Sequence, residues 1–230
     1  MYDLRFALVS LGSIQTIRGI IRLNDAFSEQ TTQLRNVTNS ERELTRVRAE
    51  LLQSSNQLGV RVGDTVTLYS RLTRGTRDLN LTERERLKLT DLINKATIVS
   101  GASTQEAAGA IRQLTQAFNR GQLRGEEFNS VAEQMPIILE AVSAATGKTR
   151  GELIKMAEDG EISTQLLLES LFKYQQVIED QAANVLPTFA RSWNKLVNEF
   201  QQAAANSNTL RIALEGLATA VRFLADNLDL

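Results

Sequence analysis

The sequence has no cysteine and no histidine among its 230 residues. Without cysteine the chain can form neither a disulfide bond nor a thiolate nucleophile. Without histidine it lacks the side chain that most often serves as a general acid or base near neutral pH. Because both common zinc ligands are missing as well, we expect no metal, no cofactor and none of the commoner classes of enzyme.

Aromatic residues and prolines are also scarce. Aromatic residues make up 5% of the chain and there are only two prolines, whereas hydrophobic residues make up 42%. This balance favours extended helices over β-sandwiches or barrels, so the sequence predicts an all-α fold. Apolar runs are short and interrupted by charge, which predicts that no part of this segment crosses a membrane.

Neither sign of charge is in excess, because 26 basic and 27 acidic residues give a formal net charge of -1. The chain therefore has no global field to attract nucleic acid, and we expect no specific nucleic-acid partner. Arg71, Arg74 and Arg77 recur every three residues, but charge runs of this kind usually form a solvated face.

Two pairs of neighbouring carboxylates are the remaining candidates for catalysis. Glu126 and Glu127 form one pair, and Glu158 and Asp159 form the other. Adjacent residues of a helix point in different directions, which suits shared acid and base work poorly. Helix capping and solvation explain these carboxylates better, and no phosphate-binding loop or Ser-x-x-Lys motif is present. The sequence predicts a protein that is not an enzyme.

What the sequence has in abundance is helical periodicity, beginning with a heptad-like seam before residue 59. Apolar residues alternate at steps of three and four, although polar residues occupy some of the same positions. Candidate self-association or partner-binding residues on this seam are Ile20, Phe27, Leu34, Val37, Leu44 and Leu51. The seam serves self-association or docking on a partner helix, or it packs against the rest of the same chain. Both alternatives stay open.

Local signals divide this N-terminal arm. Asn39, Ser40 and Glu43 resemble a helix-capping signal, so we expect two helices in place of one rod. Before the seam, the large apolar residues Leu4, Phe6 and Leu8 alternate with Arg5 and Ala7, which resembles a short strand. A helix or disorder is an equal alternative for this stretch.

The region from 60 to 182 contains repeated helix starts and stops. Capping boxes are predicted at Thr82 with Glu85, Ser103 with Glu106, and Thr149 with Glu152, while Asp64 is expected to cap an earlier helix. Helix stops are predicted at Gly101, Gly121, Gly147 and Gly160. Short connections favour antiparallel neighbours, which predicts a compact multi-helix domain.

Residues 183–230 predict a C-terminal pair of amphipathic helices. Pro187 is expected to start the first, which carries Phe189 and Trp193, and a second apolar seam follows at 210–228. The predicted organisation is a helical arm over 1–59, a helical domain over 60–182 and this pair over 183–230. We also expect the chain to be the beginning of a longer helical protein.

The stretch from residue 103 to residue 136, which is predicted to form two helices and the turn between them, carries a family resemblance. Gly121 is expected to end one helix, Glu126 and Glu127 to open the next, and Pro136 to begin a third. Residues of this corner and its surroundings recur in the order and spacing of a known family, namely Gln113, Leu114, Gly121, Leu123, Gly125, Glu126, Glu127, Phe128, Pro136 and Gly160. From about Tyr69 to Leu171 the chain resembles the conserved N-terminal domain of tape measure proteins from long-tailed bacteriophages.

The resemblance implies a virion structural protein of a bacteriophage or prophage. Such a protein occupies the tail lumen, sets tail length by its full length, and leaves the tail when DNA is ejected. It implies assembly in the host cytoplasm, with other copies of itself and tail assembly chaperone or tail tube proteins as partners. The alternative is a non-enzymatic helical adaptor or assembly chaperone whose amphipathic arm binds partner helices.

Overall fold

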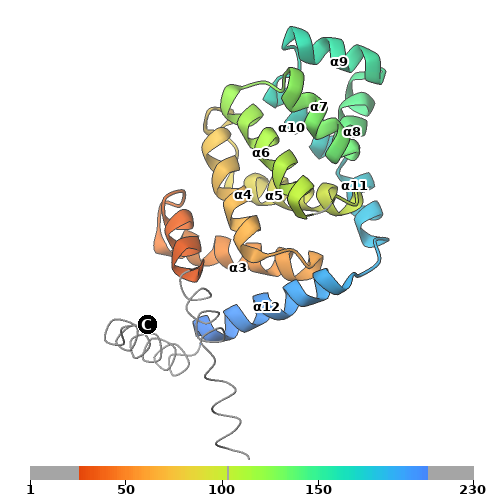
Figure 1. Ribbon diagram of the computed structural model, residues 1–230. Coiled ribbons are helices and arrows are strands. Elements are labelled where there is room, and N and C mark those ends of the chain that lie inside the picture. The colour runs from red at the N-terminus through yellow and green to blue at the C-terminus, as the bar shows by residue number, and fades with distance from the viewer. Residues whose placement is uncertain (1–25, 103, 207–230) are drawn as a thin grey trace, which may run out of the picture.

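The structure is a computed structural model that describes residues 26–102 and 104–206, and the regular elements of this part are helices (Figure 1). The prediction of an all-α fold is confirmed. A helical segment over 26–35 comes first. The elements that follow are α3 (Glu41–Leu58), α4 (Val62–Gly75), the 3₁₀ turn η1 (Arg77–Leu79), α5 (Glu83–Val99), α6 (Thr104–Arg120), α7 (Gly125–Gln134), α8 (Pro136–Thr146), α9 (Arg150–Asp159), α10 (Thr164–Lys173), α11 (Gln175–Ala183) and α12 (Phe189–Asn206).

The helices enclose two hydrophobic cores that meet at α4. The larger core lies among α4 to α11 and includes Leu72, Leu114 and Phe128. The smaller core joins the 26–35 segment and α3 to α4, where Tyr69 is fully buried. Since Leu68 and Leu72 face the larger core while Val66 and Tyr69 face the smaller one, α4 contributes to both.

Most helices begin and end at the residues that the sequence predicted. Ser40 caps α3 and accepts a hydrogen bond from the Glu43 N–H at 3.2 Å, which confirms the break in the N-terminal arm. Both capping boxes at Thr82 and Thr149 are formed. Pro136 is the first residue of α8. Ser103, the strand-like residues 4–8 and the seam at 210–228 lie outside the described residues.

Two predicted helix starts are wrong. Asp64 does not cap α4, because the helix begins at Val62, whose buried N–H has a side-chain acceptor from α12. Pro187 does not open α12, which begins at Phe189. Thr188 is the better cap, and its hydroxyl accepts a hydrogen bond from the Arg191 N–H at 3.2 Å.

Contacts cross both of the predicted segment boundaries. α3, which precedes the boundary at 59/60, packs against α4 and α5. α12, which follows the boundary at 182/183, runs beneath α3 and contacts it (Figure 1). The last described helix therefore lies beside a helix of the N-terminal segment, and the division into three segments stays a prediction.

Candidate functional site

The residues that carry the family resemblance build a junction between two loops. The Leu123 N–H donates to the Ile162 carbonyl at 2.8 Å, and the Thr164 N–H donates to the Gly121 carbonyl at 3.0 Å. These bonds join the corner after α6 to the corner after α9, with an antiparallel bridge between Gln122 and Ser163. The junction ties the corner between α6 and α7 to the corner between α9 and α10.

The backbone conformation at position 160 of this junction favours glycine. The φ of Gly160 is +75°, in the left-handed region that favours glycine. A Cβ added there would also lie 2.8 Å from the Gln122 Oε1 and 2.9 Å from the Arg124 Nε. Both atoms belong to flexible side chains that can move aside, so the left-handed backbone is the main reason for glycine at position 160.

The other family-motif residues serve corners and the core. Leu114 and Phe128 are buried in the larger core, and Gln113 is half-buried on α6. Gly125 opens α7 with a φ of 42°, and in the first turn of that helix Glu127 forms an ion pair with Arg120. Glu126 and Pro136 are exposed. The structure therefore brings only Gly121, Leu123 and Gly160 into one local arrangement, and its role there is structural.

The seam residues predicted for self-association are placed inside this chain where they are described. Leu34, Val37, Leu44 and Leu51 are buried in the smaller core, which also contains residues of α4. Phe27 is half-buried, with the Arg48 guanidinium 3.5 Å above its ring. Ile20 lies outside the described residues. Association through these four buried residues stays a prediction, and it would require the smaller core to open.

Arg48 links α3 to the first described helical segment. Its guanidinium stacks on the ring of Phe27, which is a cation–π contact. Burial lowers the pKa of Arg48 to about 10. The group therefore remains charged at neutral pH.

A set of polar contacts that the sequence patterns did not reveal holds α12 against the turn between α3 and α4. The Val62 N–H donates to the Asn198 Oδ1 at 3.1 Å, and the Asn198 Nδ2 donates to the Val60 carbonyl at 2.8 Å. The Asn194 Nδ2 donates to the Gly59 carbonyl at 3.0 Å. We call these contacts of Asn194 and Asn198 the asparagine latch. Two asparagines four residues apart opposite an apolar stripe were the only sequence signal for it.

The latch brings the backbone of α12 very close to Gly59. A Cβ added at Gly59 would lie 2.6 Å from the Arg191 Cβ and 2.9 Å from its carbonyl oxygen, and the φ of Gly59 is +70°. This glycine both ends α3 and makes room for α12.

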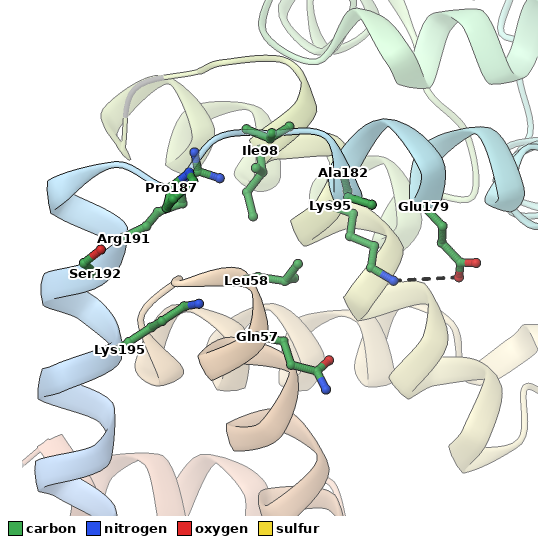
Figure 2. A pocket seen from close by; sticks show the side chains of 12 residues that line it. Gln57, Leu58, Lys95, Ile98, Glu179, Ala182, Pro187, Arg191, Ser192 and Lys195 are labelled. Carbon is green, nitrogen blue, oxygen red and sulfur yellow. Dashed lines mark ion pairs between the residues drawn. The ribbon is translucent and has the colours of Figure 1, made fainter.

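Beside the latch lies a half-open cleft of about 460 Å³ between α3, α5, α11 and α12 (Figure 2). Leu58 and Ile98 provide apolar walls, and Arg191 and Lys195 contribute positive charge from α12. Lys95 is engaged already, since its Nζ lies 2.7 Å from Asp91 and 3.7 Å from Glu179. The cleft offers apolar surface and cations, but its one carboxylate, Glu179, is held in an ion pair.

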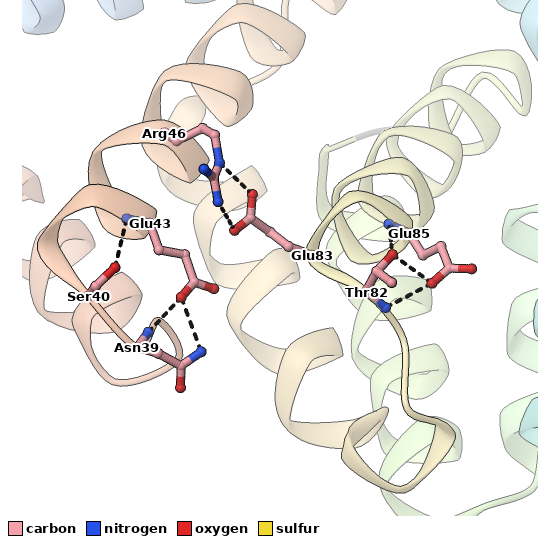
Figure 3. A network of polar contacts seen from close by, with 7 residues as sticks. All are labelled: Asn39, Ser40, Glu43, Arg46, Thr82, Glu83 and Glu85. Carbon is pink, nitrogen blue, oxygen red and sulfur yellow. Dashed lines mark hydrogen bonds and ion pairs between the residues drawn. The ribbon is translucent and has the colours of Figure 1, made fainter.

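A polar network ties the N-terminal helices together (Figure 3). Arg46 on α3 donates from Nε and Nη2 to the two carboxylate oxygens of Glu83 on α5, at 2.8 and 2.6 Å. This hydrogen-bonded ion pair lowers the pKa of Glu83 below its ordinary value. In the adjoining capping box, the bonds from Thr82 lower the pKa of Glu85. These carboxylates serve to join and cap helices.

The described residues provide little for catalysis or metal binding. Across 26–102 and 104–206, no three acidic side chains are grouped so that they could hold a metal ion. Glu158 and Asp159 are exposed at the end of α9. Of the basic residues that recur every three positions, Arg74 and Arg77 are exposed and Arg71 is half-buried. Within the same ranges, no helix has the length and apolarity needed to cross a membrane.

Comparison with known proteins identifies the relatives of this chain. The family described as "Tape measure protein" matches residues 18–209, which is most of the chain. No curated protein and no solved structure gives a significant match. The matched range covers both hydrophobic cores, the two-loop junction and the asparagine latch.

Proposed function

Because the chain belongs to the tape measure protein family, whose members are structural components of phage tails, we propose that it acts in tail assembly and in setting tail length. The observation that carries the proposal is the family match over residues 18–209. The chain is then a virion structural protein that lies in the tail lumen and is released ahead of the DNA on infection. Its partners are other copies of itself and the tail tube or tail assembly chaperone proteins, which it meets in the host cytoplasm.

Two physical features support a place in the tail lumen. The two hydrophobic cores and the two-loop junction give a folded helical unit that serves by its shape and contacts. The formal net charge of -1 also suits a component beside which DNA must slide. A strongly basic surface would retain the phosphates through counterion release.

The test is made in the phage or prophage that encodes the chain. Removal of the gene is expected to abolish tails of normal length, as measured by electron microscopy of particles. Mass spectrometry of purified virions is expected to find peptides from residues 26–206. If these peptides occur in assembling lysates but not in purified virions, the tail-lumen role is wrong and an assembly chaperone is favoured. If tails form normally without the gene, the proposal as a whole is wrong.

The length-setting role has its own experiment. In-frame shortening or lengthening of helical sequence in the full-length gene product, outside residues 18–209, is expected to change tail length in proportion. The matched control is a point substitution in the same region. A tail length that stays constant while the length of the protein changes would contradict that role.

A further inference from the structure

The last described helix, α12, is attached differently from the helices before it. Each of α3 to α11 places at least one apolar side chain in a hydrophobic core, whereas none of the α12 side chains that the structure describes belongs to either core. Among these side chains only Asn198 is buried, at 1% exposed. The helix packs mainly against α3 (Figure 1). Its attachment therefore depends on the asparagine latch more than on apolar burial.

The apolar residues of α12 add little to its stability. Phe189 is 85% exposed, and Trp193 and Leu196 are each 55% exposed. An amphipathic helix in a protein gains most of its stability from the packing of its apolar face. Because this face is open, we expect α12 to lose much of its helical structure once the latch is broken.

The connection before α12 allows the helix to leave without disturbing the rest of the chain. Ile178 on α11 is the last residue that belongs to the larger core. Most of residues 184–188 are exposed, including Leu186 and Pro187. A few exposed residues at the end of an element are the usual place for a hinge. Rotation within 184–188 therefore moves α12 alone.

We propose that α12 is a strap that docks on the turn at residues 59–62 and leaves it as one unit, while both hydrophobic cores stay folded. Each latch bond contributes only modestly to docking, because water replaces the lost partner when the helix leaves. Opening brings water to the Val62 N–H and to the Gly59 and Val60 carbonyls.

Opening of the strap changes two further features of the molecule. The helix forms one wall of the cleft in Figure 2, so its departure uncovers Leu58 and Ile98. The chain after residue 206 also continues from α12, so the latch sets the direction in which the chain leaves the two cores.

Gly59 makes the docked position sensitive to a single methyl group. A Cβ at this position would lie 2.6 Å from the Arg191 Cβ and 2.9 Å from the Arg191 carbonyl oxygen. These atoms move only with the backbone of α12. The strap therefore docks in this position only while residue 59 has no side chain.

This inference goes beyond the proposed function and does not depend on it. It concerns the folded chain alone, so the tail role and the strap are tested by separate experiments.

Hydrogen–deuterium exchange of the full chain at neutral pH, measured by mass spectrometry, tests the proposal. Peptides from α12 are expected to exchange roughly 100-fold or more faster than peptides from α6, because the strap opens without global unfolding. Trp193 is the single tryptophan of the chain and reports on the strap. Its fluorescence anisotropy is expected to fall at a lower urea concentration than the circular dichroism of the cores.

Three results would overturn the proposal. Equal protection of α12 and α6 would show that α12 belongs to the cooperative fold. Exchange of α12 at the rate of an unfolded chain would show that the helix does not dock. A single urea transition, seen alike by Trp193 and by circular dichroism, would show that α12 and the cores unfold together.

A substitution in the latch should act on the strap alone. Asn198→Ala is expected to raise the exchange rate of α12 peptides at least about fivefold, since two buried backbone groups lose their partner, and to leave α6 peptides unchanged. Glu199→Ala, exposed on the same helix, is the matched control and is expected to change the rate less than about twofold. A rise for Asn198→Ala that is equal in α12 and α6 would contradict an independent strap.

A pair of glycine substitutions tests the docked position. Gly59 and Gly147 both end helices with positive φ, at 70° and 69°, so alanine meets a similar backbone strain at each. Only at Gly59 would the new Cβ meet α12, whereas nothing lies within 4 Å of a Cβ at Gly147. Gly59→Ala is expected to raise the exchange rate of α12 peptides about tenfold or more, and Gly147→Ala is not. Equal effects of the two variants on α12 would contradict the docked geometry.

Discussion

The side-chain oxygen of Asn198 accepts a hydrogen bond from the Val62 N–H at 3.1 Å across 136 positions of sequence. The amide group of Asn198 also donates to the Val60 carbonyl at 2.8 Å. One asparagine thus satisfies a free N–H at the start of α4 and a carbonyl in the turn before it. This relationship joins the last described helix to the N-terminal half of the chain.

Replacing Asn198 by Ala should loosen this connection. The substitution leaves the Val62 N–H and the Val60 carbonyl without partners in a buried place, which costs about 1–3 kcal/mol of unfolding free energy. Urea denaturation followed by circular dichroism measures the loss. Glu199→Ala, on the exposed side of the same helix, is the control and should change the free energy by less than about 0.5 kcal/mol. A loss no larger than that of the control would mean that the contacts of Asn198 contribute nothing to stability.

The ion pair between Arg46 and Glu83 should stabilise the fold in a pH-dependent way. Its hydrogen bonds lower the pKa of Glu83 in the folded state from an ordinary value of 4.5. The stabilisation is therefore fully present above pH 4.5 and is lost as pH falls through the folded-state pKa. A double-mutant cycle with Arg46→Gln and Glu83→Gln isolates the pair from the effect of the helix dipole.

We expect a small favourable coupling free energy at neutral pH, because Arg46 is about half exposed and water screens the pair. The coupling should vanish in acid, where Glu83 is protonated in both states. Denaturant titrations at several pH values provide the measurement. A coupling that stays constant from neutral pH down to pH 2 would show that charge is not its source.

Gly160→Ala should lower the stability of the fold more than Gly147→Ala, the same change at another helix end. Both Gly147 and Gly160 end helices with positive φ, at 69° and 75°, so each alanine meets a backbone penalty of about 1 kcal/mol. Only at position 160 would the new Cβ also approach Gln122 and Arg124. Thermal denaturation should therefore give a lower melting temperature for Gly160→Ala than for Gly147→Ala. Equal melting temperatures would show that the side chains of Gln122 and Arg124 move aside for the new Cβ without cost.

Leu51→Ala tests whether the N-terminal seam is buried by its own chain. Leu51 is 2% exposed in the smaller core, so its truncation should cost about 2–5 kcal/mol. Leu186→Ala removes the same atoms from a residue that is 81% exposed and should cost less than about 0.5 kcal/mol. Chemical denaturation of dilute protein compares them. If the two losses were alike, the seam would not be packed within the monomer.

The sequence predicted those features that depend on a few neighbouring residues. The capping boxes at Thr82 and Thr149 and the helix ends at Gly121 and Gly160 follow from local hydrogen bonding and from the conformational freedom of glycine. The predicted start of α4 at Asp64 was wrong, because the side chain of Asn198, far along the chain, takes the place of a local cap. Such a partner is invisible to any pattern read within a few residues.

The placement of apolar stripes shows a second limit of pattern reading. The seam through Leu44 and Leu51 and the stripe through Phe189 and Trp193 both predict an amphipathic helix. The structure buries the first within the chain and leaves the second open. Periodicity gives the direction of an apolar face around its helix, whereas the polar contacts on the other face decide whether it turns toward the molecule.

The position of α4 between the two cores has a consequence for how the fold is lost. Val66 and Tyr69 hold one side of this helix while Leu68 and Leu72 hold the other, so neither core can melt without exposing surface that belongs to its neighbour. Unfolding is therefore expected to be cooperative, with the N-terminal and central helices released in a single step. On the proposed release from the tail, the described helices of the two cores would then pass from fully folded to fully extended without a long-lived half-folded plug.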